Sequence, residues 1–437
     1  MTTRGAGGRE SPRDIEEAFD RLWPLPRSLT GDGVRATLDI LSELHPIERT
    51  EVPSGTRVFD WTVPEEWRVA SAYLVAPDGR RFADFRDNNL HLVGYSRPYR
   101  GMLSLTDLQP HLHSLPHQPT AIPYRTSYYE PRWGFCLADE QRRTLPDGEY
   151  EVVVDTQLSP GSLTIGEAVL PGESAEEILL STYTCHPSIA NNELSGPLAV
   201  GFLMRRLAAR TRRRLTYRFV FLPETIGSIT YLWLRGEDLK RQCVGGFVVT
   251  CCGDPGPFTY KSSRRGRTAT DRIAARVLNR LAPDRHGVIP FLPDEASDER
   301  IYNSPGFDLP IGSLMRTMYG RYPQYHTSLD DKSVLSFPAL QETVDALEAM
   351  VDGFEERRMF QLTAAPEPQL GRRGLYPSTP GSWPQVSRQY WLLHYADGEH
   401  DLVDIAEMSG HSLRDLEATA EVLVGAGLIA PLQGPTT

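Results

Sequence analysis

Long apolar runs, cysteine and positive charge are all scarce in this 437-residue sequence. No stretch of about 18 apolar residues occurs, so no transmembrane helix is expected. The opening segment, MTTRGAGGRESPRD, lacks the apolar core of a signal peptide. We therefore expect a disordered leader on a cytoplasmic protein that does not associate with membranes.

The five cysteines are scattered along the chain without a CxxC pair, which excludes a disulfide framework and a zinc ribbon. Cys185 neighbours a candidate metal ligand, but we expect its side chain to point away from that ligand as a small apolar residue. Lys and Arg number 46 against 57 Asp and Glu, for a net charge of −11. This balance argues against a nucleic-acid partner.

The chain does contain enough apolar residues for a large core, because 40% of its residues are hydrophobic and 24% are charged. Its length allows two or three domains. Amphipathic stretches near 14–24 and 31–44 predict two helices. From about 50 to 160, β-type runs such as 57–62 and 69–75 are separated by Pro, Gly and Asp-Gly turns, which predicts a separate β-rich unit.

A different pattern follows, in which strands and helices alternate. Strands are predicted at 176–184, 215–222 and 244–251, with helices at 195–209 and 228–239 between them. This order implies a parallel sheet with right-handed crossovers. Ligands of such sheets bind beyond the carboxyl ends of the strands, and every motif discussed below follows a predicted strand.

The end of the chain resembles a small helical domain. A helix predicted at 335–357 is followed by a linker at 363–369. Three short helices are then predicted, at 386–396, 401–409 and 412–426, before a turn and a short strand at 425–431. This is a winged-helix pattern. From residue 371 onward it holds 4 Lys and Arg against 8 Asp and Glu, which favours a packing or dimerisation module over a DNA reader.

The segment from Cys185 to Ser195 joins the end of a strand to the start of a helix. It contains His186, Asn192 and Glu193 at the ligand-binding edge of the predicted sheet. Imidazole and carboxylate are a common zinc ligand pair, so the segment is a candidate metal site. The alternative is an ordinary helix start, capped by Asn192 or Ser195.

Two further loops complete the candidate site. His326 is followed four residues later by Asp330, which we expect to hold the imidazole, although a lone loop histidine more often has no such role. Glu224 ends an apolar strand and precedes a helix. It is either a general base for a metal-bound water or a helix N-terminal acid favoured by the macrodipole.

Other polar segments are weaker candidates for substrate contacts. Asp254 follows the third predicted strand, and the stretch 297–302 precedes Pro305 and Gly306, but Asp254 also fits a simple turn. Arg264 and Arg265 are either a solvated pair or an anchor for a carboxylate. An aromatic cluster either lines the pocket or forms the core of the β-rich unit; it comprises Tyr128, Tyr129, Arg132 and Trp133.

Several segments together carry a resemblance that no single one of them would. They are Phe59–Pro64, Asn89–His91, Ile122–Tyr129, Trp133–Cys136, Cys185–Ser188, Pro223–Ser228 and Tyr325–Ser328. Over nearly its whole length the sequence resembles a family of bacterial proteins with an aminopeptidase-like domain, often found near polysaccharide or natural-product biosynthesis genes. The family is similar to zinc aminopeptidases and glutaminyl cyclases.

The resemblance implies a fold of the α/β class. We expect a phosphorylase/hydrolase-like zinc-aminopeptidase domain formed by 1–50 and 160–360, an inserted β-rich domain at 51–159, and a C-terminal winged-helix domain at 373–437. The role of the inserted domain does not follow from the resemblance.

The sequence departs from the two-metal pattern of zinc aminopeptidases. Asn192 stands at the position of the bridging Asp, and Thr225 replaces the second Glu of the usual pair. An amide is a poor bridge between two cations. We therefore expect one zinc ion, held by His186, Glu193 and His326 with Asn192 beside them.

On this basis the predicted activity is zinc-dependent hydrolysis of an amide bond in a small peptide or an aminoacylated small molecule. Glu224 would act as the base, and Tyr325 would stabilise the oxyanion. One alternative is a deacylase, cyclase or amide-forming enzyme on the same fold. A second is a non-catalytic binding or regulatory protein, and a homo-oligomer is compatible with each.

Overall fold

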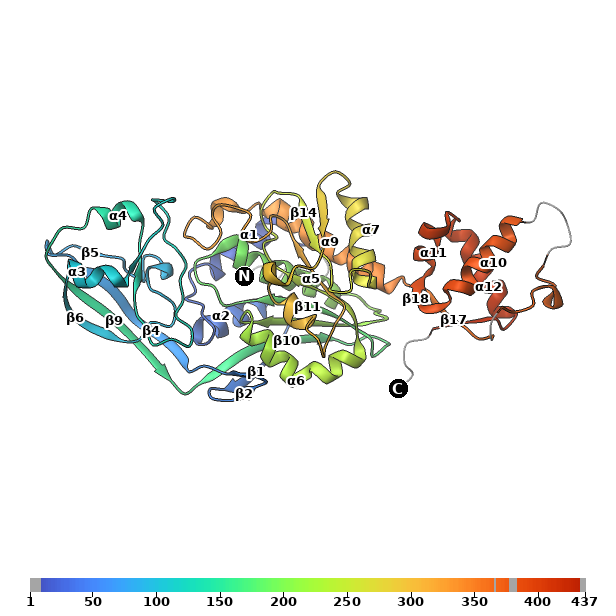
Figure 1. The fold of residues 1–437 in the computed structure, drawn as a ribbon, viewed down its shortest axis with the longest axis horizontal. Helices are drawn as coiled ribbons and strands as arrows, with labels where there is room; N and C mark the ends of the chain where they lie inside the picture. The colour runs from blue at the N-terminus through green and yellow to red at the C-terminus, as the bar shows by residue number, and fades with distance from the viewer. Residues whose placement is uncertain (1–8, 365–366, 377–382, 433–437) are drawn as a thin grey trace.

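The computed structural model describes residues 9–364, 367–376 and 383–432. Its centre is one sheet whose inner strands are parallel, as the alternation of strands and helices predicts (Figure 1). The eight strands lie in the order β1 (Glu48–Pro53), β10 (Ser162–Leu170), β12 (Thr216–Leu222), β11 (Glu177–Tyr183), β13 (Cys243–Val249), β16 (Ile311–Met315), β14 (Phe258–Lys261) and β15 (His286–Ile289).

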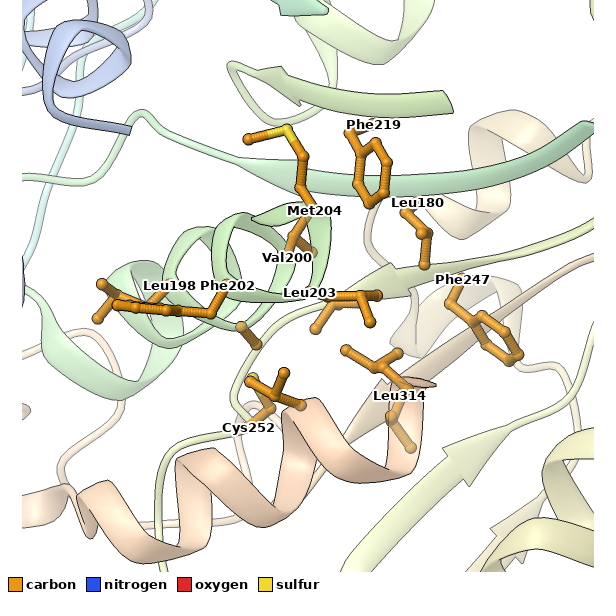
Figure 2. Close-up of a cluster of buried hydrophobic side chains, with 14 of the residues drawn as sticks. Leu180, Leu198, Val200, Phe202, Leu203, Met204, Phe219, Phe247, Cys252 and Leu314 are labelled. Carbon is orange, nitrogen blue, oxygen red and sulfur yellow. The ribbon is translucent and has the colours of Figure 1, made fainter. Parts of the chain in front are cut away.

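Alternation of side chains along the inner strands divides the core into two layers. On one face the strands pack against α5 (Ser195–Ala208) and α9 (Phe337–Glu355). Figure 2 shows Leu180, Phe219, Phe247 and Leu314 of the strands beside Val200 and Leu203 of α5. Strand residues one position along, such as Leu179 and Val220, belong to the opposite layer with α6 (Ile226–Gln242). Burial of each such side chain stabilises the fold by about 1.5–3 kcal/mol.

The elements predicted in this domain are confirmed within a few residues of their expected bounds. These include α1 (Pro12–Leu22) and α2 (Asp32–Leu41), of which α1 begins with a capping box made by Ser11 and Asp14. The sequence pattern does not single out β14, β15 and β16 or the helices α7 (Ala269–Leu281) and α8 (Glu299–Tyr302). Residues 1–8 of the expected leader lie outside the described residues.

The inserted unit leaves the central sheet after β1 and returns to it in β10. Its long strands β4 (Glu66–Val75) and β9 (Glu149–Ser159) pair antiparallel, flanked by β5 (Arg81–Phe82) and β6 (Tyr99–Ser104). The single strand expected at 57–62 is instead a hairpin of β2 (Arg57–Val58) and β3 (Trp61–Thr62). The turn between them contains Phe59 with a φ of 54°, which no strand accommodates. Smaller elements complete the unit: α3 (Leu105–Leu108), β7 (Leu112–His113), β8 (Phe135–Cys136) and α4 (Asp139–Arg143).

The C-terminal unit lies at the opposite end of the molecule from the insert (Figure 1). It packs α10 (Trp383–Tyr395), α11 (Leu402–Ser409) and α12 (Leu413–Gly425) beside a three-stranded sheet of β18 (Asp397–Asp401), β17 (Met359–Leu362) and β19 (Ile429–Pro431). Because β17 pairs with both other strands, this unit begins near 359, earlier than the expected 373. Residues 365–366 of the expected linker lie outside the described residues.

No helix within the described ranges is both long and apolar enough to cross a membrane.

Candidate functional site

The candidate residues come from three loops at the carboxyl ends of parallel strands. His186 follows β11, Glu224 follows β12, and His326 lies in the long loop after β16. Asn192 and Glu193 lie on a π-helical turn, Ala190–Leu194, that leads into α5. Such turns often mark functional sites. The topology therefore brings together motifs that are far apart in the sequence.

His186 stands between two carboxylates. Its Nδ1 lies 2.7 Å from Oε2 of Glu193, and its Nε2 lies 3.6 Å from Oε2 of Glu224. His186 and Glu193 are buried. Burial alone would lower the pKa of His186, but the adjacent Cys185 and Glu193 raise it well above its ordinary value. Burial also raises the pKa of Glu193, so both shifts favour a proton shared between Nδ1 and Oε2.

The sequence predicted that the side chain of Cys185 would point away from the site. This prediction is wrong, because the side chain contacts two residues of the site. Its Sγ lies 3.4 Å from Nδ1 of His186 and accepts the backbone N–H of Glu224 at 3.3 Å. The strand β11 ends at Tyr183, so the two-residue alternation on which the expectation relied no longer applies at this position. Burial raises the pKa of Cys185 to about 11, which keeps it a thiol.

Arg27 is part of the site, although no pattern in the sequence indicates it. It is buried, its Nε donates to the carbonyl of His186 at 3.1 Å, and it lies 3.9 Å from Oε1 of Glu193. Burial lowers the pKa of Arg27 to about 10, although the negative charge of Glu193 acts to raise it. The residue stands in a short proline-rich loop after α1, with no motif that would have distinguished it.

His326 lies opposite His186, with 5.3 Å between the two ring centroids. Its Nε2 is 3.1 Å from Oδ1 of Asn192, whose Nδ2 donates to the hydroxyl of Tyr183 at 2.7 Å. Burial, followed by the charge of His186, lowers the pKa of His326 to about 3. The imidazole of His326 is therefore neutral at physiological pH, which is the form that binds metals.

Asp330 has a different role from the one expected. Its carboxylate accepts the backbone N–H groups of Asn191 at 2.7 Å and Asn192 at 3.0 Å, and the hydroxyl of Tyr322 at 2.8 Å. It therefore fixes the π-helical turn and not the imidazole of His326. Burial raises its pKa to about 6.

Tyr325 stacks on His326, with 3.9 Å between the ring centroids. It does not line the cavity that contains His186 and Glu224. The hydroxyls of Tyr124 and Tyr128, 3.0 Å apart, belong to residues that do line it.

Glu224 is held by the stretch 297–302, which the sequence analysis ranked as a weak candidate. The hydroxyl of Ser297 donates to Oε1 of Glu224, and Oδ1 of Asp298 accepts the backbone N–H of Thr225 at 2.7 Å. Thr225 has a φ of 65°, a strained value that the Asp298 contact helps to maintain. Burial, followed by the charge of Glu224, raises the pKa of Asp298 to about 8.

His186, His326 and Glu224 line a cavity of about 350 Å³. The inserted unit supplies much of its wall through Trp61, Tyr124, Thr126, Tyr128 and Tyr129. The aromatic cluster singled out in the sequence is therefore divided. Tyr128 and Tyr129 face the cavity, whereas Trp133 stacks on Tyr99 and His111 within the insert.

The remaining weak candidates lie outside this cavity. Arg264 and Arg265 both pair with Asp308, at 3.0 and 3.6 Å, as a surface cluster. Asp254 accepts from Nδ2 of Asn191 and from Thr317 and so stabilises a turn.

The donor set is compatible with zinc. Nε2 of His326 and Oδ1 of Asn192 are separated by 3.1 Å. Two ligands of one tetrahedral zinc ion are about 3.3 Å apart when each bond is about 2.0 Å long. The thiol of Cys185, the imidazole of His186 and the carboxylate of Glu193 also lie within 4.8 Å of one another. The thiol of Cys185 and the carboxylate of Glu193 both contact Nδ1 of His186, however. Glu193 therefore lies behind the imidazole, on the side away from Nε2.

Comparison with known proteins places this geometry in context. A family model described as a domain of unknown function (DUF4910) matches residues 17–357, and a winged helix-turn-helix model matches 357–431. A Clostridium acetobutylicum protein named for polysaccharide biosynthesis and an aminopeptidase-like domain is 42% identical over 418 residues, 95% of each chain.

Solved structures give the same picture. The crystal structure of a C. acetobutylicum protein titled as a peptidase superposes with a TM-score of 0.81 at 40% identity, covering 96% of each chain. A zinc aminopeptidase from Bacillus subtilis superposes with a TM-score of 0.56 at 11% identity, covering 80% of this chain and 95% of that one. The latter likeness concerns the fold alone.

Proposed function

Because this chain belongs to the DUF4910 family and shares the fold of zinc aminopeptidases, we propose that it hydrolyses an amide bond with the help of one zinc ion. The substrate would be a small peptide or an aminoacylated small molecule. The observation that carries the proposal is the 3.6 Å approach of Nε2 of His186 to Oε2 of Glu224 on the wall of a cavity.

In this proposal the two imidazoles and the amide of Asn192 hold the ion. Nε2 of His326 lies 3.1 Å from Oδ1 of Asn192, and the rings of His186 and His326 are 5.3 Å apart between their centroids. Bound zinc would supply a Lewis acid and a water of lowered pKa. Glu193, which the sequence analysis treated as a ligand, would instead accept the Nδ1 proton of His186 and fix its ring.

Glu224 is the proposed general base. Its Oε1 is held by the hydroxyl of Ser297, while Oε2 remains directed toward His186. Oε2 would accept a proton from the attacking water and later deliver it to the leaving amine. Tyr124 lines the cavity beside both imidazoles, so its hydroxyl takes over the oxyanion-stabilising role that the sequence analysis gave to Tyr325.

The test combines metal analysis with hydrolysis of alanyl anilides. Glu224→Gln should retain zinc but lower kcat by about a hundredfold or more, because the amide cannot accept the proton. Glu237→Gln is a matched control, because Glu237 lies on the exposed surface of α6 and pairs only with Lys240 within the described chain. A metal-free wild type with full activity, or a fully active Glu224→Gln variant, would contradict the proposal.

The name of the C. acetobutylicum relative favours a second candidate, a deacylase that acts on an amide of a saccharide intermediate. The same catalytic residues would serve both reactions. Product analysis on alanyl anilides and on N-acyl amino sugars separates the two candidates.

A further inference from the structure

A second cavity adjoins the catalytic one. Its volume is about 490 Å³, and the two cavities share Tyr124 and His326 in their walls. The rest of the second cavity is lined by residues of the insert between 113 and 125 and by the loop 320–327, which carries His326. A substrate bound at His326 therefore lies next to a space formed mainly by the insert.

Hydrogen bonds hold the insert against the loop that carries His326 and so fix the wall of the second cavity. The backbone N–H of Tyr124 donates to the carbonyl of His326 at 2.8 Å, and that of Ser328 donates to the carbonyl of Ile122 at 2.8 Å. The side-chain amide of Gln118 donates to the carbonyl of Pro323 at 2.6 Å. These bonds join the two segments as a short strand pair would, so the cavity is already formed in the protein without a ligand.

The lining of the second cavity is basic. It contains Arg125, His113 and His117 and no Asp or Glu among the described residues. The guanidinium of Arg125 is exposed and has no ion pair or hydrogen bond with any residue that the structure describes, whereas nearby Arg132 pairs with Glu130 at 2.7 Å. Burial, followed by the charge of Arg125 and other basic groups, lowers the pKa of His113 to about 4. Arg125 therefore supplies the positive charge of the second cavity, and no carboxylate among the described lining residues balances it.

From this geometry we propose that the second cavity binds a carboxylate or phosphate group of the substrate, with Arg125 as its anchor. The inference rests on the proposed function and narrows its substrate class to acyl or aminoacyl amides that carry an anionic group near the scissile bond. Arginine suits this role because its planar fork pairs with both kinds of oxyanion. The hydroxyl of Ser114 and the amide of Gln118, which also line the cavity, add neutral hydrogen-bonding groups.

The test compares matched anilides in which the acyl part or the amine part carries a carboxamide, a carboxylate or a phosphate. Arg125→Gln should lower kcat/KM for the preferred anionic substrate by about tenfold or more and leave the carboxamide within about twofold. Arg125→Glu should reverse the preference. Arg100→Gln is the matched control, because Arg100 is an exposed arginine of the same insert that lies outside the cavity lining.

A second readout does not depend on catalysis. Calorimetric titration of the wild type with inorganic phosphate, repeated on Arg125→Gln, should show binding that the variant weakens by about tenfold. Phosphate binding at Arg125 without hydrolysis of any amide would uphold the anion site and reject the proposed function. The inference would be overturned if the wild type hydrolysed anionic and neutral substrates equally well. It would also be overturned if Arg125→Gln left both the preference for anionic substrates and the binding of phosphate unchanged.

Discussion

Two carboxylates flank His186, and their positions assign them different tasks. Glu193 is fully buried and contacts Nδ1, whereas Glu224 reaches the Nε2 side and the cavity. A buried carboxylate behind a ligating imidazole fixes its tautomer and increases its basicity. The sequence presents both residues simply as acids after a strand, so this distinction requires the fold.

We predict that Glu193→Gln weakens zinc binding by about 10- to 100-fold, because the amide keeps the shape of the side chain but is a weaker acceptor for Nδ1–H. Competition with a chromogenic chelator measures the affinity. Zinc affinity equal to that of the wild type would show that Glu193 neither orients His186 nor binds the ion. Glu237→Gln again serves as the unaffected control.

At the scale of elements, an ion pair joins the catalytic domain to the insert. Arg35 of α2 donates to both carboxylate oxygens of Glu66 in β4, at 3.0 and 2.7 Å. The side chain of Glu66 is only 4% exposed. The hydrogen bonds from Arg35 lower the pKa of Glu66 to about 2 from an ordinary 4.5.

The resulting pH dependence has a definite sign. Because the native pKa of Glu66 is depressed, its contribution to stability is complete above about pH 4.5 and is lost as the pH falls toward 2. Glu66→Gln should therefore lower the free energy of unfolding by about 1–3 kcal/mol at pH 7. In urea titrations, the difference in the free energy of unfolding between the variant and the wild type should become smaller as the pH falls from 7 to 3. A constant gap, or an equal loss in the exposed neighbour variant Glu65→Gln, would contradict this assignment.

The sequence predicts some elements much better than others. The strands β11, β12 and β13 are buried apolar runs, and their patterns leave little choice of structure. The short strands β14 and β15 are the last two of the sheet and lack such a run, so pairing with neighbours decides their conformation.

The candidate site was predictable to a similar degree. The predicted topology places His186 and Glu224 at one edge of the sheet, whereas His326 follows β16, which the sequence pattern does not single out. Contacts that depend on loop geometry, such as those of Arg27, Cys185 and Asp330, follow only from the three-dimensional arrangement.

At the scale of the whole molecule, the C-terminal unit is docked on α7 through buried charge. Asp404 of α11 is 2% exposed and accepts from Arg272 at 2.8 Å and from Arg276 at 3.0 Å. Among the described residues, the ion pairs of this unit are with α7 and with Arg357 and Arg358, and none is with the catalytic loops. The expectation of a packing or dimerisation module stays a prediction.

We predict that Asp404→Asn destabilises this docking by about 1–3 kcal/mol, because two arginines lose a buried anionic partner while the Asp401 side chain still caps the helix. Hydrogen exchange should become faster in α7 and α11. Glu407→Gln, at a side chain that is 56% exposed and pairs with Arg276, should change stability by less than about 0.5 kcal/mol. Unchanged exchange in Asp404→Asn would show that apolar contacts alone hold the unit.

The insert begins and ends at adjacent positions of the central sheet. Pro53 of β1 is paired with Ser162 of β10, and the backbone N–H of Ser54 donates to the carbonyl of Gly161 at 2.9 Å. A segment whose two ends are neighbours can be transplanted between related chains without cutting the catalytic strands. Because this segment supplies Tyr128 to one cavity and Arg125 to the other, such chimaeras would exchange substrate preference while His186, Glu224 and His326 remain in place.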